Sequence, residues 1–154
     1  MRTVFLVSAR APVRPLFLLS LPRSGSTLLQ RLLAADEGIA TAAEPWLLLP
    51  QVYALRKRGM YAEYGQSGVA RALSDFVDAL PGGRGEYETL LRRFVLELYT
   101  KASDEGATYF LDKTPRYSLI AQDLNRLFPE AKFIFLWRNP LAIVASIIET
   151  WGQG

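Results

Sequence analysis

The chain has 154 residues, half of them hydrophobic, which is enough for a single domain, 1–154, with a substantial core. Its net charge of +3 is small and no basic run stands out, so the composition does not indicate nucleic-acid binding. The sequence contains no Cys and no His, which excludes disulfides, thiolate chemistry and the most common general base and metal ligand. Acid–base chemistry is left to Glu, Asp, Lys and Tyr.

Residues 3–8 are expected to form a short edge strand or to be the remnant of a leader. No apolar run approaches the roughly 20 residues that are needed to cross a bilayer. We therefore expect a cytoplasmic protein without a membrane span.

The first well-defined strand is expected at residues 16–21, and a helix is expected from Ser26 to about Ala35. The first turn of such a helix has N–H groups without intrahelical partners, and Gly25 just before it lets the backbone approach a ligand. The strand–loop–helix pattern predicts a phosphate or sulfate site. A plain turn in which Ser24 caps the helix is equally consistent with the loop alone.

The loop differs from the P-loop signature of nucleotide hydrolases. That signature places a Lys after its last glycine, whereas here Arg23 precedes Gly25. The predicted anion site is therefore not a standard ATP site.

Strands and helices alternate along the rest of the chain. We expect strands at 39–43, 108–111 and 132–137, and helices at 45–58, 69–80, 87–103, 118–128 and 140–151. This alternation predicts an α/β fold, a three-layer sandwich with a central parallel sheet and helices on both faces. Residues 59–68 have no clear period and are expected to form a loop or lid.

The expected helix at 87–103 carries an apolar stripe that we predict to face the core. Its members are Leu90, Leu91, Phe94, Val95 and Leu98.

Four polar clusters follow the expected strands. Ligands of parallel sheets bind at the carboxyl ends of the strands. This rule brings the loop 23–27, Glu44, Lys113 and Arg138 to one rim of the sheet.

The loop at 23–27 and the segment Arg138-Asn139-Pro140, with Ser146 eight residues after Arg138, resemble the two-part cofactor signature of sulfotransferases. These enzymes use 3′-phosphoadenosine 5′-phosphosulfate (PAPS). The resemblance implies that a P-loop-like element holds the 5′-phosphosulfate and that a second element holds the 3′-phosphate. The residues implied are Arg23, Ser24, Gly25, Ser26, Thr27 and Leu28 for the first element, and Arg138 and Ser146 for the second.

The resemblance also implies the catalytic residues. In the tyrosylprotein sulfotransferase branch a catalytic Glu lies 21 positions after the Arg of the loop, which corresponds to Glu44. Lys113 lies in a segment similar to a Lys-containing motif of that branch and of bacterial relatives, and would neutralise charge on the departing oxygen. Cytosolic members use a His base, which this chain lacks. No metal is required by this chemistry.

Each of these residues has an alternative interpretation. Glu44 could cap a helix, and Lys113 could pair with Asp112 or Glu130. Asp112 after an apolar strand also imitates a magnesium site, which would suit a P-loop-like kinase or NTPase. A third alternative is a truncated, non-catalytic nucleotide-binding module, because family members are usually longer.

The acceptor is not specified by the sequence. The resemblance allows a hydroxyl or amine of a small molecule, a carbohydrate or a peptide, and the oligomeric state is open. The aromatic residues Trp46, Tyr61, Tyr64 and Trp151 are candidates for walls of the acceptor pocket, although aromatic residues more often belong to the core.

Overall fold

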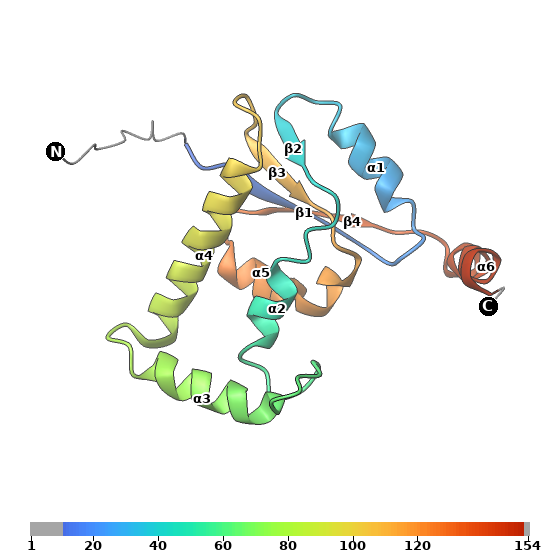
Figure 1. Cartoon of the computed structure of the whole chain (residues 1–154). Coiled ribbons are helices and arrows are strands. Elements are labelled where there is room, and N and C mark those ends of the chain that lie inside the picture. The colour runs from blue at the N-terminus through green and yellow to red at the C-terminus, as the bar shows by residue number, and fades with distance from the viewer. Residues whose placement is uncertain (1–10, 153–154) are drawn as a thin grey trace.

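A parallel sheet of four strands in the order β2-β3-β1-β4 organises the computed structural model, which describes residues 11–152. The expected strand or leader at 3–8 lies outside the described residues. The strands are β1 (Arg14–Ser20), β2 (Ile39–Thr41), β3 (Tyr109–Asp112) and β4 (Lys132–Leu136). The helices are α1 (Ser26–Leu33), α2 (Leu48–Tyr53), α3 (Gln66–Asp78), α4 (Gly83–Lys101), the 3₁₀-helix η1 (Pro115–Ile120), α5 (Ala121–Leu127) and α6 (Pro140–Trp151) (Figure 1).

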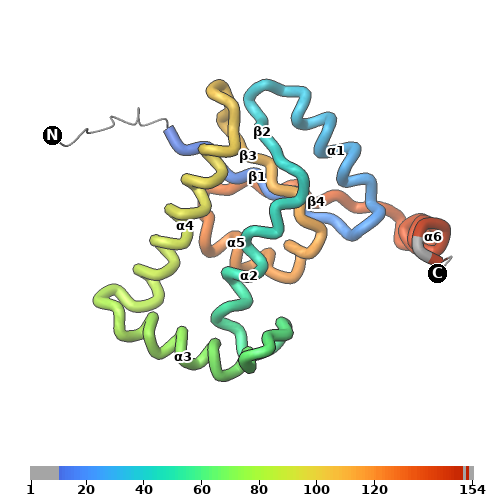
Figure 2. Tube along the Cα trace, viewed as in Figure 1, coloured from blue at the N-terminus to red at the C-terminus, as the bar shows by residue number. Residues whose placement is uncertain are grey.

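The sheet lies between two helical layers, as the sequence predicts. Side chains of β1 alternate, so that Phe17 and Leu19 lie on one face while Leu16 and Leu18 lie on the other. Residues of α2, α4, η1 and α5 cover the first face, and α1 covers the second (Figure 2). All strand pairs are parallel, which confirms the predicted three-layer α/β architecture.

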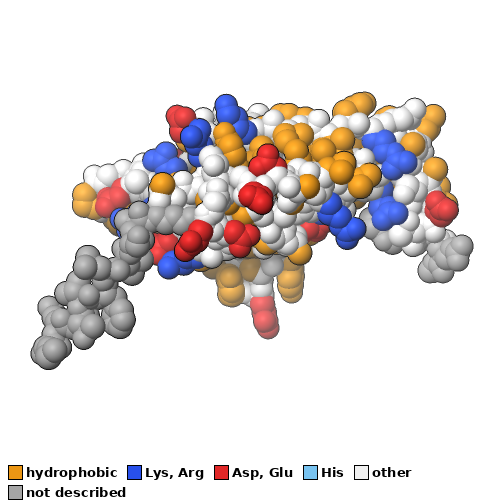
Figure 3. Space-filling model, turned by 90° about the horizontal axis from the view of Figure 1, so that it is seen from above, with side chains coloured by type: hydrophobic (Ala, Val, Ile, Leu, Met, Phe, Trp, Pro, Cys, Tyr) orange, Lys and Arg blue, Asp and Glu red, His pale blue; other side chains and the backbone are white. Residues whose placement is uncertain are grey.

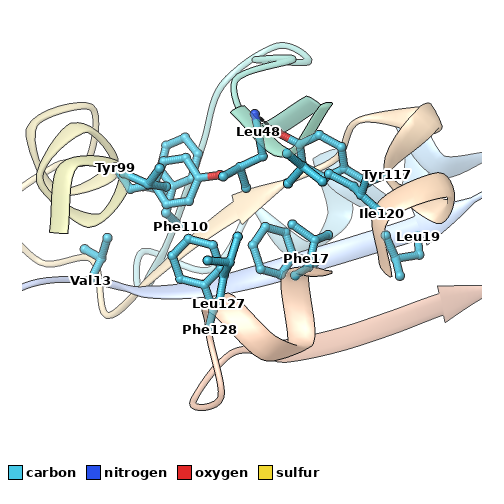
Figure 4. Packing of buried hydrophobic residues seen from close by; sticks show 14 residues of the cluster. Val13, Phe17, Leu19, Leu48, Tyr99, Phe110, Tyr117, Ile120, Leu127 and Phe128 are labelled. Carbon is cyan, nitrogen blue, oxygen red and sulfur yellow. Dashed lines mark hydrogen bonds between the residues drawn. The ribbon is translucent and has the colours of Figure 1, made fainter. Parts of the chain in front are cut away.

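The larger core lies on the face beneath α2, α4 and α5, and it is built around aromatic rings. Phe17 is fully buried, and its ring centroid lies 5.7 Å from that of Phe128 and 5.5 Å from that of Phe133. Tyr99 from α4 stacks on Phe110 from β3 with centroids 4.3 Å apart (Figure 4). These contacts fix α4 and α5 on the sheet.

Several element bounds differ from the prediction. Helix α2 begins at Leu48 instead of Pro45, because the backbone of Trp46 has a left-handed φ of 54° and cannot continue a right-handed helix. The expected helix at 118–128 is divided into η1 and α5. Helix α2 ends at Tyr53 and helix α3 begins at Gln66, so the irregular segment is 54–65 instead of 59–68. The predicted helix at 140–151 is confirmed.

The predicted core-facing stripe of α4 is partly wrong. Leu90, Phe94 and Leu98 are exposed, whereas Val95 and Tyr99 are buried. Leu91, which packs partly buried against the core, is spaced by four residues from Val95, and Val95 by four from Tyr99. The true core stripe therefore includes a tyrosine that a purely apolar pattern does not select.

Part of the surface is apolar. Hydrophobic side chains gather on the face seen in Figure 3, and α1 exposes Leu28 and Leu32. Phe135 and Trp137 at the end of β4 are exposed as well. Across residues 11–152, no helix has the length and apolarity required to cross a bilayer.

Candidate functional site

The carboxyl ends of the four strands lie at one edge of the sheet because all strand pairs are parallel. Each strand is followed by one of the predicted polar clusters. The loop 23–27 follows β1, Glu44 follows β2, Lys113 follows β3 and Arg138 follows β4. At this edge the structure forms two centres, one around the loop and one around Lys113.

The loop after β1 has an unusual backbone. Arg23 has a φ of 64° and Gly25 a φ of 91°, so two residues of the turn adopt the left-handed conformation. For the non-glycine Arg23 this conformation costs free energy, and such residues cluster at ligand sites. Turns of this kind direct successive N–H groups to one side, which creates a concave site for an anion.

Helix α1 starts without a capping side chain, and Gly25 is its N-cap residue. The alternative in which Ser24 caps the helix is therefore wrong. The hydroxyl of Ser24 is buried and has no hydrogen-bond partner among residues 11–152. A buried hydroxyl without a hydrogen-bond partner costs free energy.

The two parts of the predicted cofactor signature meet around one cavity. The cavity has a volume of about 240 Å³ and is lined by Arg23, Gly25, Ser26, Thr27, Arg138 and Ser146. Nη1 of Arg138 donates to the backbone oxygen of Arg23 over 2.8 Å, and Nε of Arg23 donates to Oγ of Ser146 over 3.1 Å. Segments more than a hundred residues apart in sequence thus build one cationic cavity, whose guanidinium, hydroxyl and first-turn N–H donors suit an anionic ligand.

Two of the predicted cofactor residues do not line this cavity. The side chain of Leu28 is exposed on α1, so only its first-turn N–H remains as a candidate donor. Ser24 is buried in the loop and is not among the lining residues.

The second centre is an ion pair between the two predicted catalytic residues. Nζ of Lys113 lies 2.6 Å from Oε1 of Glu44. The Lys113 side chain is 4% exposed and that of Glu44 36%. Lys113 thus forms its ion pair with Glu44 instead of Asp112 or Glu130. Glu44 does not cap α2, which has Leu47 as its N-cap residue.

The segment that carries Glu44 is held by a residue that the sequence analysis missed. Nε2 of Gln30 on α1 donates to Oγ1 of Thr41 over 2.8 Å and to the carbonyl of Ala42 over 2.9 Å. Oγ1 of Thr41 in turn donates to the carbonyl of Leu111 on β3 over 2.7 Å. A polar Gln inside the apolar run of α1 is the sequence signal for this role, because a buried amide needs partners.

Asp112, which precedes Lys113, is fully buried and accepts three hydrogen bonds. Oδ1 accepts from Oγ1 of Thr114 over 2.9 Å, and Oδ2 accepts from the hydroxyls of Tyr99 and Tyr117 over 2.6 and 3.0 Å. Burial raises the pKa of Asp112, and these donors partly offset the rise. Since both carboxylate oxygens are engaged within the core, the magnesium-site interpretation of Asp112 loses its basis.

A second cavity of about 320 Å³ adjoins the segments that carry the ion pair. Its wall includes Trp46, Leu49, Tyr53, Met60, Leu119 and Arg116. Trp46 is two residues from Glu44, and Arg116 is three residues from Lys113. Of the other aromatic candidates, Tyr61 and Tyr64 are exposed and are not among the lining residues, and the Trp151 side chain lies outside the described part of the chain.

The wall of this second cavity is closely packed. Gly59 has a φ of 98°, and a Cβ at this position would lie 2.5 Å from Cε1 of Tyr53. Gln66, also buried, donates to the carbonyls of Tyr53 and Arg56 over 3.0 and 2.9 Å. These contacts fix the segment after α2 against the cavity.

Comparison with known proteins agrees with this geometry. Residues 15–154 match the family model described as "Sulfotransferase family". The chain is 38% identical over 137 residues to nodulation protein NoeE of Sinorhizobium fredii, covering 88% of this chain and 31% of that protein. It is 29% identical over 134 residues to human protein-tyrosine sulfotransferase 1, covering 87% of this chain and 34% of that protein. The chain thus spans about a third of the length of these relatives.

Proposed function

Because the chain belongs to the sulfotransferase family, we propose that it transfers a sulfuryl group from PAPS to a hydroxyl or amine of an acceptor. The observation that carries this proposal is the meeting of the loop 23–27 with Arg138 and Ser146 around one cavity. Two guanidinium groups and the first turn of a helix converge there from distant parts of the chain. A donor with both a 5′-phosphosulfate and a 3′-phosphate would engage both elements.

In this proposal, the loop binds the phosphosulfate through the N–H groups of the first turn of α1 and through Arg23. Arg138 and Ser146 bind the 3′-phosphate, and a charge-assisted contact of Arg138 gives preference over nucleotides without that group.

The transfer step forms an S–O bond to a hydroxyl acceptor, or an S–N bond to an amine, and breaks the S–O bond to the bridging oxygen of the phosphosulfate. Glu44 accepts the proton of the acceptor hydroxyl, and Lys113 stabilises the negative charge that develops on the bridging oxygen. The products are the sulfated acceptor and 3′-phosphoadenosine 5′-phosphate. Positioning and electrostatic stabilisation supply most of the catalysis, and the chemistry needs no metal ion.

The acceptor is proposed to bind in the cavity beside Trp46. Its wall is mainly apolar, and Arg116 is its charged member. The segments that carry Glu44 and Lys113 build most of the wall, and Gly59 and Met60 complete it. The left-handed backbone of Trp46 and its half-exposed indole support a binding role, because strain of this kind is retained at ligand sites. A small-molecule, carbohydrate or peptide acceptor would have to present an apolar surface to this wall.

Calorimetry with 3′-phosphoadenosine 5′-phosphate, ADP and ATP tests the proposal. We expect 3′-phosphoadenosine 5′-phosphate to bind at least about tenfold more tightly than ADP without magnesium, the worth of one charge-assisted contact. Arg138→Ala should remove most of this preference. Arg93→Ala, the same change at an exposed position of α4, should preserve it.

Two results would count against the proposal. Equal affinity for 3′-phosphoadenosine 5′-phosphate and ADP, or strict magnesium dependence, would favour a kinase-like site. A chain that binds none of these nucleotides would refute the assignment of the cavity.

A further inference from the structure

Tyr117 of η1 is a fully buried residue whose hydroxyl group joins two segments of the site. Its hydroxyl donates to Oδ2 of Asp112 over 3.0 Å and accepts from the backbone N–H of Leu48 over 3.1 Å. Figure 4 shows the hydroxyl of Tyr117 turned toward the backbone nitrogen of Leu48. One oxygen atom therefore connects the end of β3 with the start of α2.

These two segments carry the ion pair. Leu48 is four residues after Glu44, and Asp112 immediately precedes Lys113. The N–H of Leu48 belongs to the first turn of α2, where backbone donors have no intrahelical partner and need one from outside the helix. Tyr117 supplies that partner, and so fixes the start of α2 relative to β3.

The direction of the two hydrogen bonds is determined by the charges. Burial, and then the nearby Asp112 carboxylate, raise the pKa of Tyr117, so its phenol stays protonated. Its proton is directed to Asp112, which leaves a lone pair of the same oxygen for the N–H of Leu48. A phenylalanine at this position would fill the same volume and make neither contact.

Tyr99 provides a built-in comparison. It approaches from α4, is also buried, and donates to the same Oδ2 of Asp112 over 2.6 Å. Its hydroxyl bonds Asp112 and also interacts with the Tyr117 hydroxyl, whereas the N–H of Leu48 donates to Tyr117. Removing the Tyr99 hydroxyl therefore weakens the hydrogen bonding around Asp112 and Tyr117 but removes no hydrogen bond to Leu48.

We propose that Tyr117 is a positioning residue, which holds Glu44 and Lys113 in register through Leu48 and Asp112. The same link joins two of the segments that line the apolar cavity, since Trp46 and Leu49 belong to one and Arg116 and Leu119 to the other. The catalytic consequence rests on the proposed function, whereas the structural consequence does not.

Three variants test this role: Tyr117→Phe, Tyr99→Phe and the double variant. Hydrogen exchange of the Leu48 amide and the NMR signal of the Trp46 indole, assigned with Trp46→Phe, report on the start of α2 directly. In Tyr117→Phe we expect the exchange rate of the Leu48 amide to rise by a factor at least about ten times larger than the factor for the β1 amides. The Trp46 signal should shift as well. In Tyr99→Phe, exchange at Leu48 should change only as much as it does in β1.

Turnover provides the second readout. A displacement of about 1 Å at a reacting group can lower the rate by about a hundredfold, so we expect kcat of Tyr117→Phe to fall by at least about tenfold. The affinity for 3′-phosphoadenosine 5′-phosphate should stay within about threefold, because the loop 23–27 is not part of this link. Tyr99→Phe should retain kcat within about threefold.

The outcomes separate the two proposals. If the chain binds no nucleotide, the proposed function fails, while the exchange and NMR data still decide the positioning role. If Tyr117→Phe and Tyr99→Phe change Leu48 and Trp46 equally, Tyr117 is only a core residue and the inference is overturned. If Tyr117→Phe does not fold, hydrogen exchange of the wild-type protein tests the link instead. A Leu48 amide that exchanges as fast as a first-turn amide without a hydrogen-bond partner would contradict the link.

Discussion

Removing the carboxylate of Glu44 is expected to destabilise the fold more than removing the ammonium group of Lys113, although the two form one ion pair. The Lys113 side chain is 4% exposed and that of Glu44 36%. In Glu44→Gln, the buried ammonium group keeps a hydrogen-bond acceptor but loses its counter-charge. In Lys113→Met, an apolar side chain of similar length fills the buried position, and the carboxylate remains partly solvated.

The magnitude follows from this asymmetry. Removal of one partner from a fully buried ion pair costs about 3–5 kcal/mol, because the other charge is left uncompensated. Glu44 reaches solvent and the glutamine keeps the hydrogen bond, so we expect a loss of about 2 kcal/mol for Glu44→Gln. For Lys113→Met the expected change is within about 1 kcal/mol, since a partly exposed carboxylate needs its partner less. A loss of about 2 kcal/mol would lower Tm by about 6 °C in a chain of this size.

Urea unfolding followed by circular dichroism measures both variants and the double variant at neutral pH. The double variant should be more stable than Glu44→Gln, because it no longer contains a buried ammonium group. Equal losses in the two single variants would refute the reasoning. So would a double variant that is less stable than Glu44→Gln.

Three further predictions concern the loop, the core and the chemistry. Gly25→Val should abolish nucleotide binding in calorimetry. Gly65→Val, which also lies at a positive φ (81°) with open surroundings just before a helix, should retain binding, and loss of binding in both variants would contradict the site. The pKa of Asp112 is raised above its usual 3.8, so its contribution to stability is present below that value and is lost as pH rises through the raised pKa. The unfolding free energy of wild type minus that of Asp112→Asn should therefore fall as pH rises above 3.8, and a difference that does not change with pH would contradict the shift. Glu44→Gln should lower turnover by about 10²–10⁴-fold and keep nucleotide affinity within a few fold, and full activity would mean that the base lies elsewhere.

The strand ends were predictable because their signals are local. A basic residue follows the last residue of each strand within three positions, Arg23 after β1 and Arg138 after β4. The parallel topology then brings both strand ends to one edge of the sheet. The spacing of eight residues places Arg138 in the loop after β4 and Ser146 in the helix that follows it. The sequence therefore predicted which elements line the first cavity.

The contacts within the core were not predictable in the same way. Leu90, Phe94 and Leu98 match a helical apolar stripe, yet they are exposed because α4 turns Val95 and Tyr99 toward the sheet. An apolar pattern does not count a tyrosine as a core residue, although the Asp112 carboxylate gives the Tyr99 hydroxyl a buried partner. Tertiary hydrogen bonds of this kind leave no periodic signal along the chain.

The pairing of Glu44 with Lys113 also bears on the order of substrate binding. A buried ammonium group is stable only beside a counter-charge, so Lys113 can release Glu44 only when another anion reaches Nζ. Under the proposed function the phosphosulfate is such an anion, whereas an uncharged acceptor hydroxyl is not. We therefore expect the donor to bind first and Glu44 to accept a proton only once the donor is in place.

Calorimetry tests this order of binding. In the wild-type chain an acceptor should bind more tightly after saturation with 3′-phosphoadenosine 5′-phosphate, and in Lys113→Met this gain in acceptor affinity should be smaller. An acceptor affinity that is unchanged by the nucleotide in the wild-type chain would show that the ion pair does not control access to Glu44.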